Sequence, residues 1–510
     1  MNGMGAGGST ATGSGGLTGT GSGGVRWSGT GGSSLPSGCA GGCSDFAGRP
    51  FGPDGTSTLP AGAEQAFAGT PASSGGPCLL EPQDGTLLPN NWLRPRFSWT
   101  STGIGDLYEL HVVAPNQNPD LIVYTDKTSW TMPKMMWLAL SGHTQDMPMT
   151  VTVLSAHGGA VSTGTTARFT VAPVGASGSL VYWSPTGSTN GGPGESGLTT
   201  LNGFAVGDES VGQVLSCGTV NKVPQCDIKT SDWQTLDASF NPEPVQCIGC
   251  HTSTPDGNFI SFNNFYPWGG VLASGQPESL GAAPTFLGAG GYKAFVQPWL
   301  GITTYSSNHW TNGDHIVVAP LGSKNDDTDQ QSGLAWIDLE NASALSSGQN
   351  PFTVLKGTAW NWIYPPTAGK YAAAPSWSHR PSNDFIVFTA TSNVKSGRLG
   401  TGTAHLYQVP YSKTAPQSAT PISGLDDATN PKYAQYYGTL SYDDAYIVYD
   451  QVDTKVAAST HPDLNSTDTT GTWDGMYMQP TAELYVTPTS GGPGIRLAAN
   501  DPASCPGQPV

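Results

Sequence analysis

A polar turn followed by an apolar strand recurs four times in the second half of the chain, and this repeat constrains the fold more than any other feature. The residues that mark the four turns are Thr254, Thr311, Ser378 and Ser441. The copies are therefore about 60 residues apart, and each is expected to contribute one unit of a repetitive architecture. In the last three copies a second apolar strand is expected at residues 334–339, 405–409 and 483–486, with short outer strands at 352–355, 419–422 and 495–497.

About four strands per repeat is the content of one propeller blade, so the sequence predicts an all-β propeller domain over residues 178–510. The residues Pro255-Asp256-Gly257 and Trp377-Ser378 resemble the blade turns of the TolB-like (PD40) β-propeller family, over roughly residues 250–500. This resemblance implies blades of that type but no particular activity. Four blades are recognisable and residues 180–245 supply a fifth. Closed propellers with blades of this size usually have more, so we expect the propeller to be incomplete at its C-terminal end.

The segment before the repeats predicts a separate β-sandwich at residues 78–174. Short runs of alternating apolar and polar residues are separated by turn residues at the spacing typical of sandwich domains. The expected strands lie at 79–80, 97–99, 108–113, 122–124, 149–153 and 167–171. The segment resembles a fibronectin type III-like domain, which implies a spacing or adhesive role.

Residues 1–76 are of low complexity and predict a disordered tether. Gly, Ser and Thr dominate its first part, and such a segment has too few apolar side chains to offset the entropy lost on folding. By analogy with Gly-rich tethers that follow a lipid-anchored Cys in bacterial surface proteins, we expect a lipid anchor in the native chain. Met1 leads directly into this tether without an export signal, so we also expect that the native N-terminus is missing. Cys39 and Cys43 either form a local disulfide or remain unpaired.

One five-residue motif, Cys247-Ile248-Gly249-Cys250-His251, specifies a chemistry. Two thiols two residues apart, followed at once by an imidazole, are what covalent c-type haem requires. The thiols form thioethers with the porphyrin vinyl groups, and the His ligates the iron. Two alternatives remain open: Cys247 and Cys250 form a disulfide beside an unrelated His, or they act as a metal-binding or redox dithiol. The main hypothesis is haem c held by Cys247 and Cys250, with His251 as the proximal iron ligand.

Four residues are candidates for the sixth position of the haem iron. In the register of the repeats, His309 and His379 fall within a few positions of His251. Equivalent positions of successive blades ring the same end of a propeller, so either imidazole could approach the iron from the far side. The alternative is that both are turn residues at a polar rim. Met476 and Met478, in an insertion of the fourth repeat, are rival axial ligands. An empty sixth position would allow small-ligand binding or peroxidase-like chemistry.

Charge and composition restrict the partners and the compartment. Only 11% of the residues are charged and the formal net charge is −17, which argues against binding to nucleic acid because nothing neutralises phosphates. The chain has 69 Gly, 41 Pro and 8 Cys, a composition typical of a turn-rich β protein from an oxidising compartment. Cys217 and Cys226 flank a short loop and are predicted to form a disulfide. No apolar run is long enough to span a bilayer. We therefore expect the periplasm or cell surface of a Gram-negative bacterium.

Other chemistry is sparse, so a non-enzymatic role is favoured. The chain lacks G-x-S-x-G, H-E-x-x-H and a phosphate-binding Gly-rich loop. Two acidic loops, Asp326-Asp327-Thr328-Asp329 and residues 463–468, could hold Ca²⁺ through side-chain oxygens, although neither has the spacing of an EF-hand and a solvated loop is the simpler interpretation. Two hypotheses follow. In the first, the chain is an extracytoplasmic electron-transfer protein in which a propeller carries one c-type haem and meets a redox partner. In the second, it is a surface scaffold for protein interaction, with Cys247 and Cys250 in a disulfide and no haem.

Overall fold

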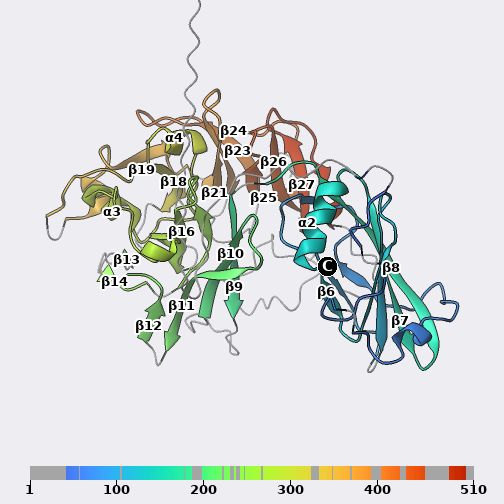
Figure 1. Cartoon of the computed structure of the whole chain (residues 1–510). Helices are drawn as coiled ribbons and strands as arrows, with labels where there is room; N and C mark the ends of the chain where they lie inside the picture. The colour runs from blue at the N-terminus through green and yellow to red at the C-terminus, as the bar shows by residue number, and fades with distance from the viewer. Residues whose placement is uncertain are drawn as a thin grey trace, which may run out of the picture.

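The computed structural model describes residues 39–500 except for residues 40–41, 47, 57, 104–105, 177, 187–197, 221–222, 230–234, 237–241, 246, 266–267, 323–331, 347–348, 368–369, 392–403, 426–431 and 454–481. The described chain is built mainly of strands (Figure 1). A β-sandwich comes first, drawn in blue to cyan, and a series of propeller-like sheets follows in green to red. The all-β fold class and its division into a sandwich and propeller-like sheets are as the sequence predicts.

The sandwich pairs a five-stranded sheet, in the order β2-β8-β7-β4-β5, with a three-stranded sheet, in the order β1-β3-β6. Their bounds are β1 Leu79–Glu81, β2 Thr86–Pro89, β3 Arg96–Trp99, β4 Leu107–Val113, β5 Leu121–Thr125, β6 Ser129–Thr131, β7 Met149–His157 and β8 Ala160–Ala172. Leu110 of β4 lies opposite Val153 of β7, and both are buried. Every second residue of these strands is buried because successive side chains point to opposite faces of a sheet.

The sandwich begins earlier than expected. Phe46 is buried in the sandwich core, and Phe51 packs against that core. The backbone N–H of Phe51 donates to Ile122 at 2.9 Å and its carbonyl accepts from Tyr124 at 2.8 Å, which adds an edge to β5. The short helix α1 (Ala63–Ala66) follows. The predicted tether boundary at residue 76 is therefore wrong: from Cys43 onward, a few apolar side chains are enough to dock this Gly-rich segment on the sheet.

A helix that the strand pattern did not predict, α2 (Lys134–His143), covers the sandwich beside β6. Trp137 and Leu140 are buried, and Trp137 Nε1 donates to the carbonyl of Trp92 at 2.9 Å. The opposite side of the helix carries Met135 and Leu138, which are exposed. Apolar residues on both faces obscure the 3.6-residue period by which an amphipathic helix is recognised.

Five propeller-like sheets follow, which we number blades 1 to 5 along the chain. Blade 1 is β9 Ser179–Thr186, β10 Leu198–Ala205, β11 Gly212–Val220 and β12 Val223–Cys226, and blade 2 is β15 His251–Ser253, β16 Phe259–Phe265 and β17 Trp268–Ser274. Blade 3 is β18 Ile316–Gly322, β19 Ser332–Asp338 and β20 Trp360–Tyr364. Blade 4 is β21 Tyr371–Trp377, β22 Phe385–Thr391, β23 Ala404–Pro410 and β24 Thr420–Pro421, and blade 5 is β25 Tyr433–Leu440, β26 Tyr446–Asp453, β27 Glu483–Pro488 and β28 Ile495–Arg496. The remaining elements are β13 Thr235–Leu236, β14 Pro242–Glu243, η1 Pro277–Ser279, α3 Ala289–Phe295 and η3 Ala498–Asn500.

The repeated Ser or Thr has the same structural task in three blades. The hydroxyl of Thr254 accepts from the backbone N–H of Phe259, that of Ser378 from Phe385, and that of Ser441 from Tyr446, at 3.0 to 3.1 Å. In each case the donor is the first residue of the next strand of the blade, so the hydroxyl closes the turn that joins two strands. This bond explains why the hydroxyl residue recurs while the residues around it vary.

Blade 3 departs from the repeat at two places. Thr311 lies in the helix α4 (Ser307–Thr311), and its hydroxyl donates to the carbonyl of Ser307 at 2.7 Å instead of closing a turn. Residues 300–304 supply an additional inner edge through bridges from Leu300 and Thr304 to β18. The outer strand expected at 352–355 is also wrong. That segment forms the helix α5 (Pro351–Val354), because Pro351 occupies its first turn and the side chain of Asn350 caps the N–H of Phe352.

The sandwich contacts blade 1 through a small mixed interface. Glu209, which follows β10, lies 2.6 Å from Lys134 of α2 and 3.5 Å from Arg94. Beside these ion pairs, the rings of Trp92 and Phe204 meet edge to face with centroids 5.1 Å apart. Among the described residues, this interface thus includes one carboxylate, two cations and one aromatic pair.

The predicted disulfide Cys217–Cys226 is present, and Cys39 and Cys43, for which the sequence left both outcomes open, are also joined. The Cys217–Cys226 bond joins β11 to β12 at a directly paired position. Cys78 is disulfide-bonded as well. None of the helices in the described part of the chain combines the length and the apolar character needed to cross a bilayer.

Candidate functional site

The motif residues Cys247 to Cys250 form a loop that leads into β15, and blade 1 holds this loop by its backbone. The N–H of Ile248 donates to the hydroxyl of Thr199 at 3.0 Å, and its carbonyl accepts from Trp183 Nε1 at 2.9 Å. The side chain of Ile248 is fully buried. Ile248, the first of the two residues between the cysteines, is therefore an anchor for the loop.

Gly249 is required by close packing. Its N–H donates to the carbonyl of Asn263 at 2.8 Å, and the N–H of Asn263 donates to the carbonyl of Cys250 at 3.0 Å. A Cβ atom at position 249 would lie only 3.0 Å from that Asn263 carbonyl. The loop thus depends on a residue without a side chain to lie against β16.

Cys247 and Cys250 are free thiols, and both are partly buried. Burial raises the pKa of both thiols, and at Cys247 the hydroxyl of Thr199, 3.9 Å from the sulfur, opposes this shift. Neutral thiols are poor nucleophiles and poor metal ligands, because both roles need the thiolate. The described geometry therefore gives no sign of a catalytic cysteine or of a preformed thiolate metal site at Cys247 and Cys250.

His251 opens β15, and its side chain reaches blade 1. Nε2 lies 3.2 Å from the carbonyl oxygen of Val181. Burial lowers the pKa of His251, and the contact with Val181 only partly opposes this. The ring is therefore neutral at pH 7, and because a carbonyl can only accept, Nε2 carries the proton and Nδ1 carries the lone pair.

The residues of the motif fit covalent haem in the kind and order of their donors. Two free thiols flank two anchored residues, Ile248 and Gly249, and a neutral imidazole follows directly, which is the state that ligates iron. One contact would have to change: Nε2 of His251 must leave the carbonyl of Val181 before it can reach a metal. The disulfide alternative is not formed, since both thiols are free.

His309 is not placed as a free ligand. Its Nδ1 lies 2.7 Å from Asp314 and its Nε2 lies 2.9 Å from Asp384, so both ring nitrogens are engaged by carboxylates. Burial acts to lower its pKa, but the two carboxylates outweigh burial and raise the pKa to about 9. A doubly hydrogen-bonded imidazolium has no lone pair for iron, which favours the alternative of a structural residue for His309.

His379 has one engaged and one open nitrogen. Nδ1 lies 2.8 Å from Asp444 of blade 5, whose carboxylate also accepts from the backbone N–H groups of His379 and Arg380. His379 lines a cavity between the blades, whereas His251 is absent from its wall. Met476, Met478 and the acidic loops at 326–329 and 463–468 lie outside the described residues.

A second cluster of potential metal ligands joins Cys39, Cys43 and His143. The two sulfurs are bonded to each other, so they offer no thiolate, and His143 Nδ1 lies 3.0 Å from the carboxylate of Asp45. These contacts hold the N-terminal segment on the sandwich.

The cavity that His379 lines was not anticipated from the sequence. It has a volume of about 370 Å³ and lies where β15, residues 302–307, β21 and β25 approach one another. The repeat predicts that equivalent strands gather at the centre of a propeller, but it does not show where their backbones leave an open space.

No protein-family model matches this chain, and no curated protein matches it. Two solved structures are distantly similar. One is named as a 6-phosphogluconolactonase from Bacteroides uniformis, with 10% identity, 69% of this chain and 93% of that chain covered, and a TM-score of 0.21. The other is a DUF4784 family protein from Bacteroides caccae, with 8% identity, coverage of 74% and 94%, and a TM-score of 0.20. At these scores neither structure informs the function.

Proposed function

We propose that this chain is an extracytoplasmic electron-transfer protein in which TolB-like propeller blades carry one c-type haem. Cys247 and Cys250 hold the porphyrin through thioether bonds, and His251 binds the iron. The haem supplies one-electron exchange at its iron, and the chain's own residues attach it, orient it and set its surroundings.

The observation that supports this proposal best is the distribution of paired and free cysteines. Cys39, Cys43, Cys78, Cys217 and Cys226 are in disulfides. Among the cysteines that the structure describes, Cys247 and Cys250 alone are free, although they are as close in sequence as any pair in the chain. An oxidising compartment favours disulfides, so two thiols kept apart in a C-x-x-C-H motif are best explained by covalent attachment to a cofactor.

The surroundings of the motif suit an attached group on a fixed support. Thr199 and Trp183 of blade 1 hold Ile248 from one side, and Asn263 of blade 2 holds Gly249 from the other. Both sulfurs are thus presented at the junction of two blades. Burial keeps His251 neutral, so the ring carries a single proton. That proton moves from Nε2 to Nδ1 when Nε2 turns from the Val181 carbonyl to the iron.

The location and partners follow from the same proposal. Haem of this type is attached outside the cytoplasm, and the disulfides agree with an oxidising compartment. We propose the periplasm or surface of a Gram-negative bacterium, with attachment through a lipid anchor in the native chain and a protein redox partner. The net charge of −17 favours a partner with a basic contact surface.

The direct test is intact-mass analysis of the chain exported from a host that has haem-attachment machinery. We expect one added tetrapyrrole mass and sharp reduced absorption bands that survive acid–acetone extraction. The Cys247→Ser/Cys250→Ser double variant should lose the added mass and the colour. His251→Ala should keep the added mass when attachment succeeds, but change the bands, because the iron loses a ligand. Cys217→Ser/Cys226→Ser, which opens the disulfide between β11 and β12 of blade 1, is the matched control and should remain coloured.

One observation favours a second candidate function, a surface scaffold for protein interaction. The contact between His251 Nε2 and the Val181 carbonyl satisfies the imidazole without a metal. If the exported chain is colourless and its mass shows Cys247 and Cys250 linked to each other, the haem proposal is excluded and the scaffold function is preferred.

A further inference from the structure

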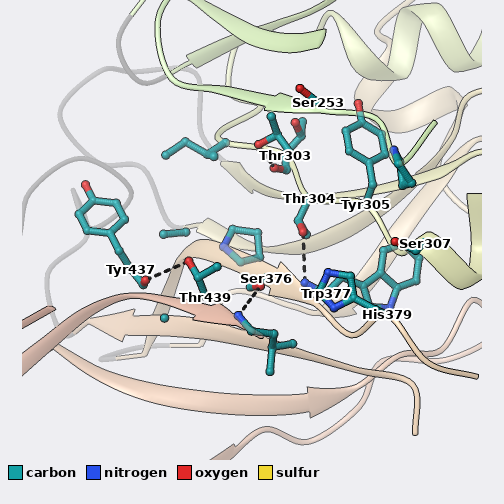
Figure 2. Close-up of a pocket in the computed structure, with 17 residues that line it drawn as sticks. Ser253, Thr303, Thr304, Tyr305, Ser307, Ser376, Trp377, His379, Tyr437 and Thr439 are labelled. Carbon is teal, nitrogen blue, oxygen red and sulfur yellow. Dashed lines mark hydrogen bonds between the residues drawn. The ribbon is translucent and has the colours of Figure 1, made fainter. Parts of the chain in front are cut away.

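The central cavity has walls without ionic side chains. Its described lining contains no Asp, Glu, Lys or Arg, although the chain as a whole has a net charge of −17. Hydroxyl-bearing residues from blades 2 to 5 and the loop before α4 make up much of the wall, and Figure 2 shows them around one space. A cavity of about 370 Å³ is within the range that holds a small ligand. Its chemistry favours a neutral ligand that exchanges hydrogen bonds with hydroxyl groups.

Tyr305 places an unpartnered hydroxyl in this wall. Its side chain is 5% exposed, and its hydroxyl is buried without a partner at hydrogen-bond distance. The hydroxyls of Ser261 and Thr303 lie close enough to influence its pKa, but burial dominates and raises that pKa, so the group remains a donor. A buried hydroxyl without a partner is costly. The hydroxyl has almost no accessible surface of its own, so a ligand oxygen can supply the missing partner once a small side-chain movement opens it to the cavity.

Further polar groups in the lining have capacity for a ligand. The hydroxyls of Ser253 and Ser307 make no hydrogen bond with the described residues. His379 engages Asp444 through Nδ1 alone, so in the neutral ring Nε2 is an acceptor facing away from that carboxylate. Figure 2 shows Ser253 and Tyr305 on one side of the space and Thr439 on the other. The lining thus offers both donors and acceptors.

Two backbone distortions shape the same wall. Ala374 of β21 and Tyr437 of β25 adopt φ of 43° and 52°, the left-handed region that side chains rarely occupy. Each lies at a bulge where the pairing of its strand shifts register, and both line the cavity. Strained non-glycine residues persist only where the surrounding structure enforces them, and they concentrate at ligand sites. Because the same distortion occurs in two adjacent blades, we take the shape of the cavity wall to be a specific feature of the fold.

Aromatic rings stand at the edge of this cavity. Tyr437 is 37% exposed and Tyr442 is 81% exposed, and the ring of Tyr442 lies 5.8 Å from that of His379 in the lining. A tyrosine ring offers an apolar face with a polar tip. Such a face suits the C–H side of a pyranose ring, while hydroxyl groups deeper in the cavity suit the sugar hydroxyls.

We propose that the central cavity binds a short neutral saccharide, held by Tyr305, Ser253 and His379 and bordered by Tyr437 and Tyr442. A free peptide is a poorer match, because the described lining has no charged group to receive a terminus or an ionic side chain. An anionic sugar is disfavoured for the same reason. This inference does not depend on haem attachment, and a chain with Cys247→Ser should still bind the saccharide.

The test is calorimetric titration of the full chain with neutral di- and trisaccharides of glucose, galactose, mannose and N-acetylglucosamine, up to about 10 mM. We expect at least one of them to bind. Tyr305→Phe should weaken that binding about tenfold, because one hydrogen bond to the ligand is lost. The same variant should leave the melting temperature unchanged or raise it, since the hydroxyl has no partner in the free protein. A purely structural Tyr305 would instead lower the melting temperature.

Tyr449→Phe is the matched control, because Tyr449 is a buried tyrosine of blade 5 outside the cavity lining. It should leave saccharide affinity unchanged. Ser253→Ala should weaken binding as a second, independent variant. The proposal is overturned if no neutral saccharide binds at these concentrations, if Tyr305→Phe and Ser253→Ala both bind like the unmodified chain, or if only peptides or anionic saccharides from parallel titrations bind.

Discussion

Nε2 of His309 lies 2.9 Å from the carboxylate of Asp384, across the boundary between blade 3 and blade 4. The same carboxylate accepts from Trp377 Nε1 at 2.6 Å, and the His309 ring lies over Trp377 with centroids 4.5 Å apart. On its other side, His309 meets Asp314 at 2.7 Å. One cation thus links Asp314 of its own blade to Asp384 of the neighbouring blade, which makes it a determinant of how these two blades pack.

His309→Gln is therefore expected to destabilise the fold by about 2 kcal/mol near pH 6, because a charge-assisted hydrogen bond is lost and two carboxylates lose their shared cation. The measurement is urea unfolding of the variant and the unmodified chain. His111→Gln, which removes a more exposed partner of Asp120 in the sandwich, is the control and should have a much smaller effect. An equal effect of the two substitutions would contradict the role assigned to His309.

The same residue predicts a pH dependence. The folded pKa of His309 is about 9 and lies above its ordinary value near 6.5. Below about pH 6.5 the folded and unfolded chains both bind this proton, and the stabilisation is fully present. It decreases as the pH rises from 6.5 to 9 and is lost above that. The unmodified chain should lose more stability between pH 6 and pH 10 than His309→Gln does, as measured by the difference in their melting temperatures at each pH.

Asp450 of β26 predicts a pH dependence of stability opposite to that of His309. Burial raises its pKa to about 6, well above the ordinary value of 3.8, so its carboxylate destabilises the fold at neutral pH. That penalty is relieved as the pH falls through 6. Asp450→Asn should raise the melting temperature at pH 7.5 and have little effect at pH 4. Asp84, whose pKa is held low by hydrogen bonds to Arg168, provides a contrast: Asp84→Asn should not stabilise the chain at pH 7.5.

Asp444 should contribute more to the stability of the fold than its neighbour Asp443. It accepts from the backbone N–H groups of His379 and Arg380 and from the His379 ring, so Asp444→Ala leaves inter-blade donors without a partner. We expect a loss of about 2–3 kcal/mol. Asp443 caps only its own turn through Ser441 and Ala445, and Asp443→Ala should have a smaller effect. Urea unfolding measures the stability lost in each variant. A larger loss in Asp443→Ala than in Asp444→Ala would contradict the inter-blade role of Asp444.

Gly249→Ala tests the support of the C-x-x-C-H loop. The added methyl group would lie 3.0 Å from the Asn263 carbonyl, so the loop or β16 must shift by a few tenths of an ångström and the hydrogen bonds between them weaken. We expect less haem per chain by absorbance, with only a small change in the melting temperature of the whole protein. Gly69→Ala, where an added Cβ meets nothing within 4 Å, is the control and should attach haem normally. Normal attachment in Gly249→Ala would show that the loop is not held in this arrangement when the haem is joined.

Local patterns in the sequence predicted the strands well, and contacts between distant segments explain what was missed. The turns at Thr254, Ser378 and Ser441 repeat because each hydroxyl closes its own hairpin, and this is visible within one repeat. Phe46 and Phe51 lie in a Gly-rich stretch, and only their contacts with the sandwich core and with β5 show that they dock. Asn350 and Pro351 form a local helix start at α5, whereas the register of the repeats predicted an outer strand at the same place.

The sequence predicted the residues of the C-x-x-C-H motif but not their surroundings in the fold. Spacing alone identifies Cys247, Cys250 and His251, and the structure adds that the thiols are free and that the imidazole faces Val181. The register of the repeats placed His309 near the same end of the blades, but no sequence rule shows that Asp314 and Asp384 occupy both of its nitrogens. The cavity could not be predicted, because it depends on bulges in β21 and β25 that have no common sequence.

Those bulges at Ala374 and Tyr437 have a consequence for engineering. The same backbone distortion is formed once by an alanine before proline and once by a tyrosine before glycine, so it is a property of the blade module and not of one side chain. A chimera in which blade 5 replaces blade 4 should therefore keep the contour of the central wall while changing the groups displayed on it. Blade exchange offers a modular route to altered ligand preference.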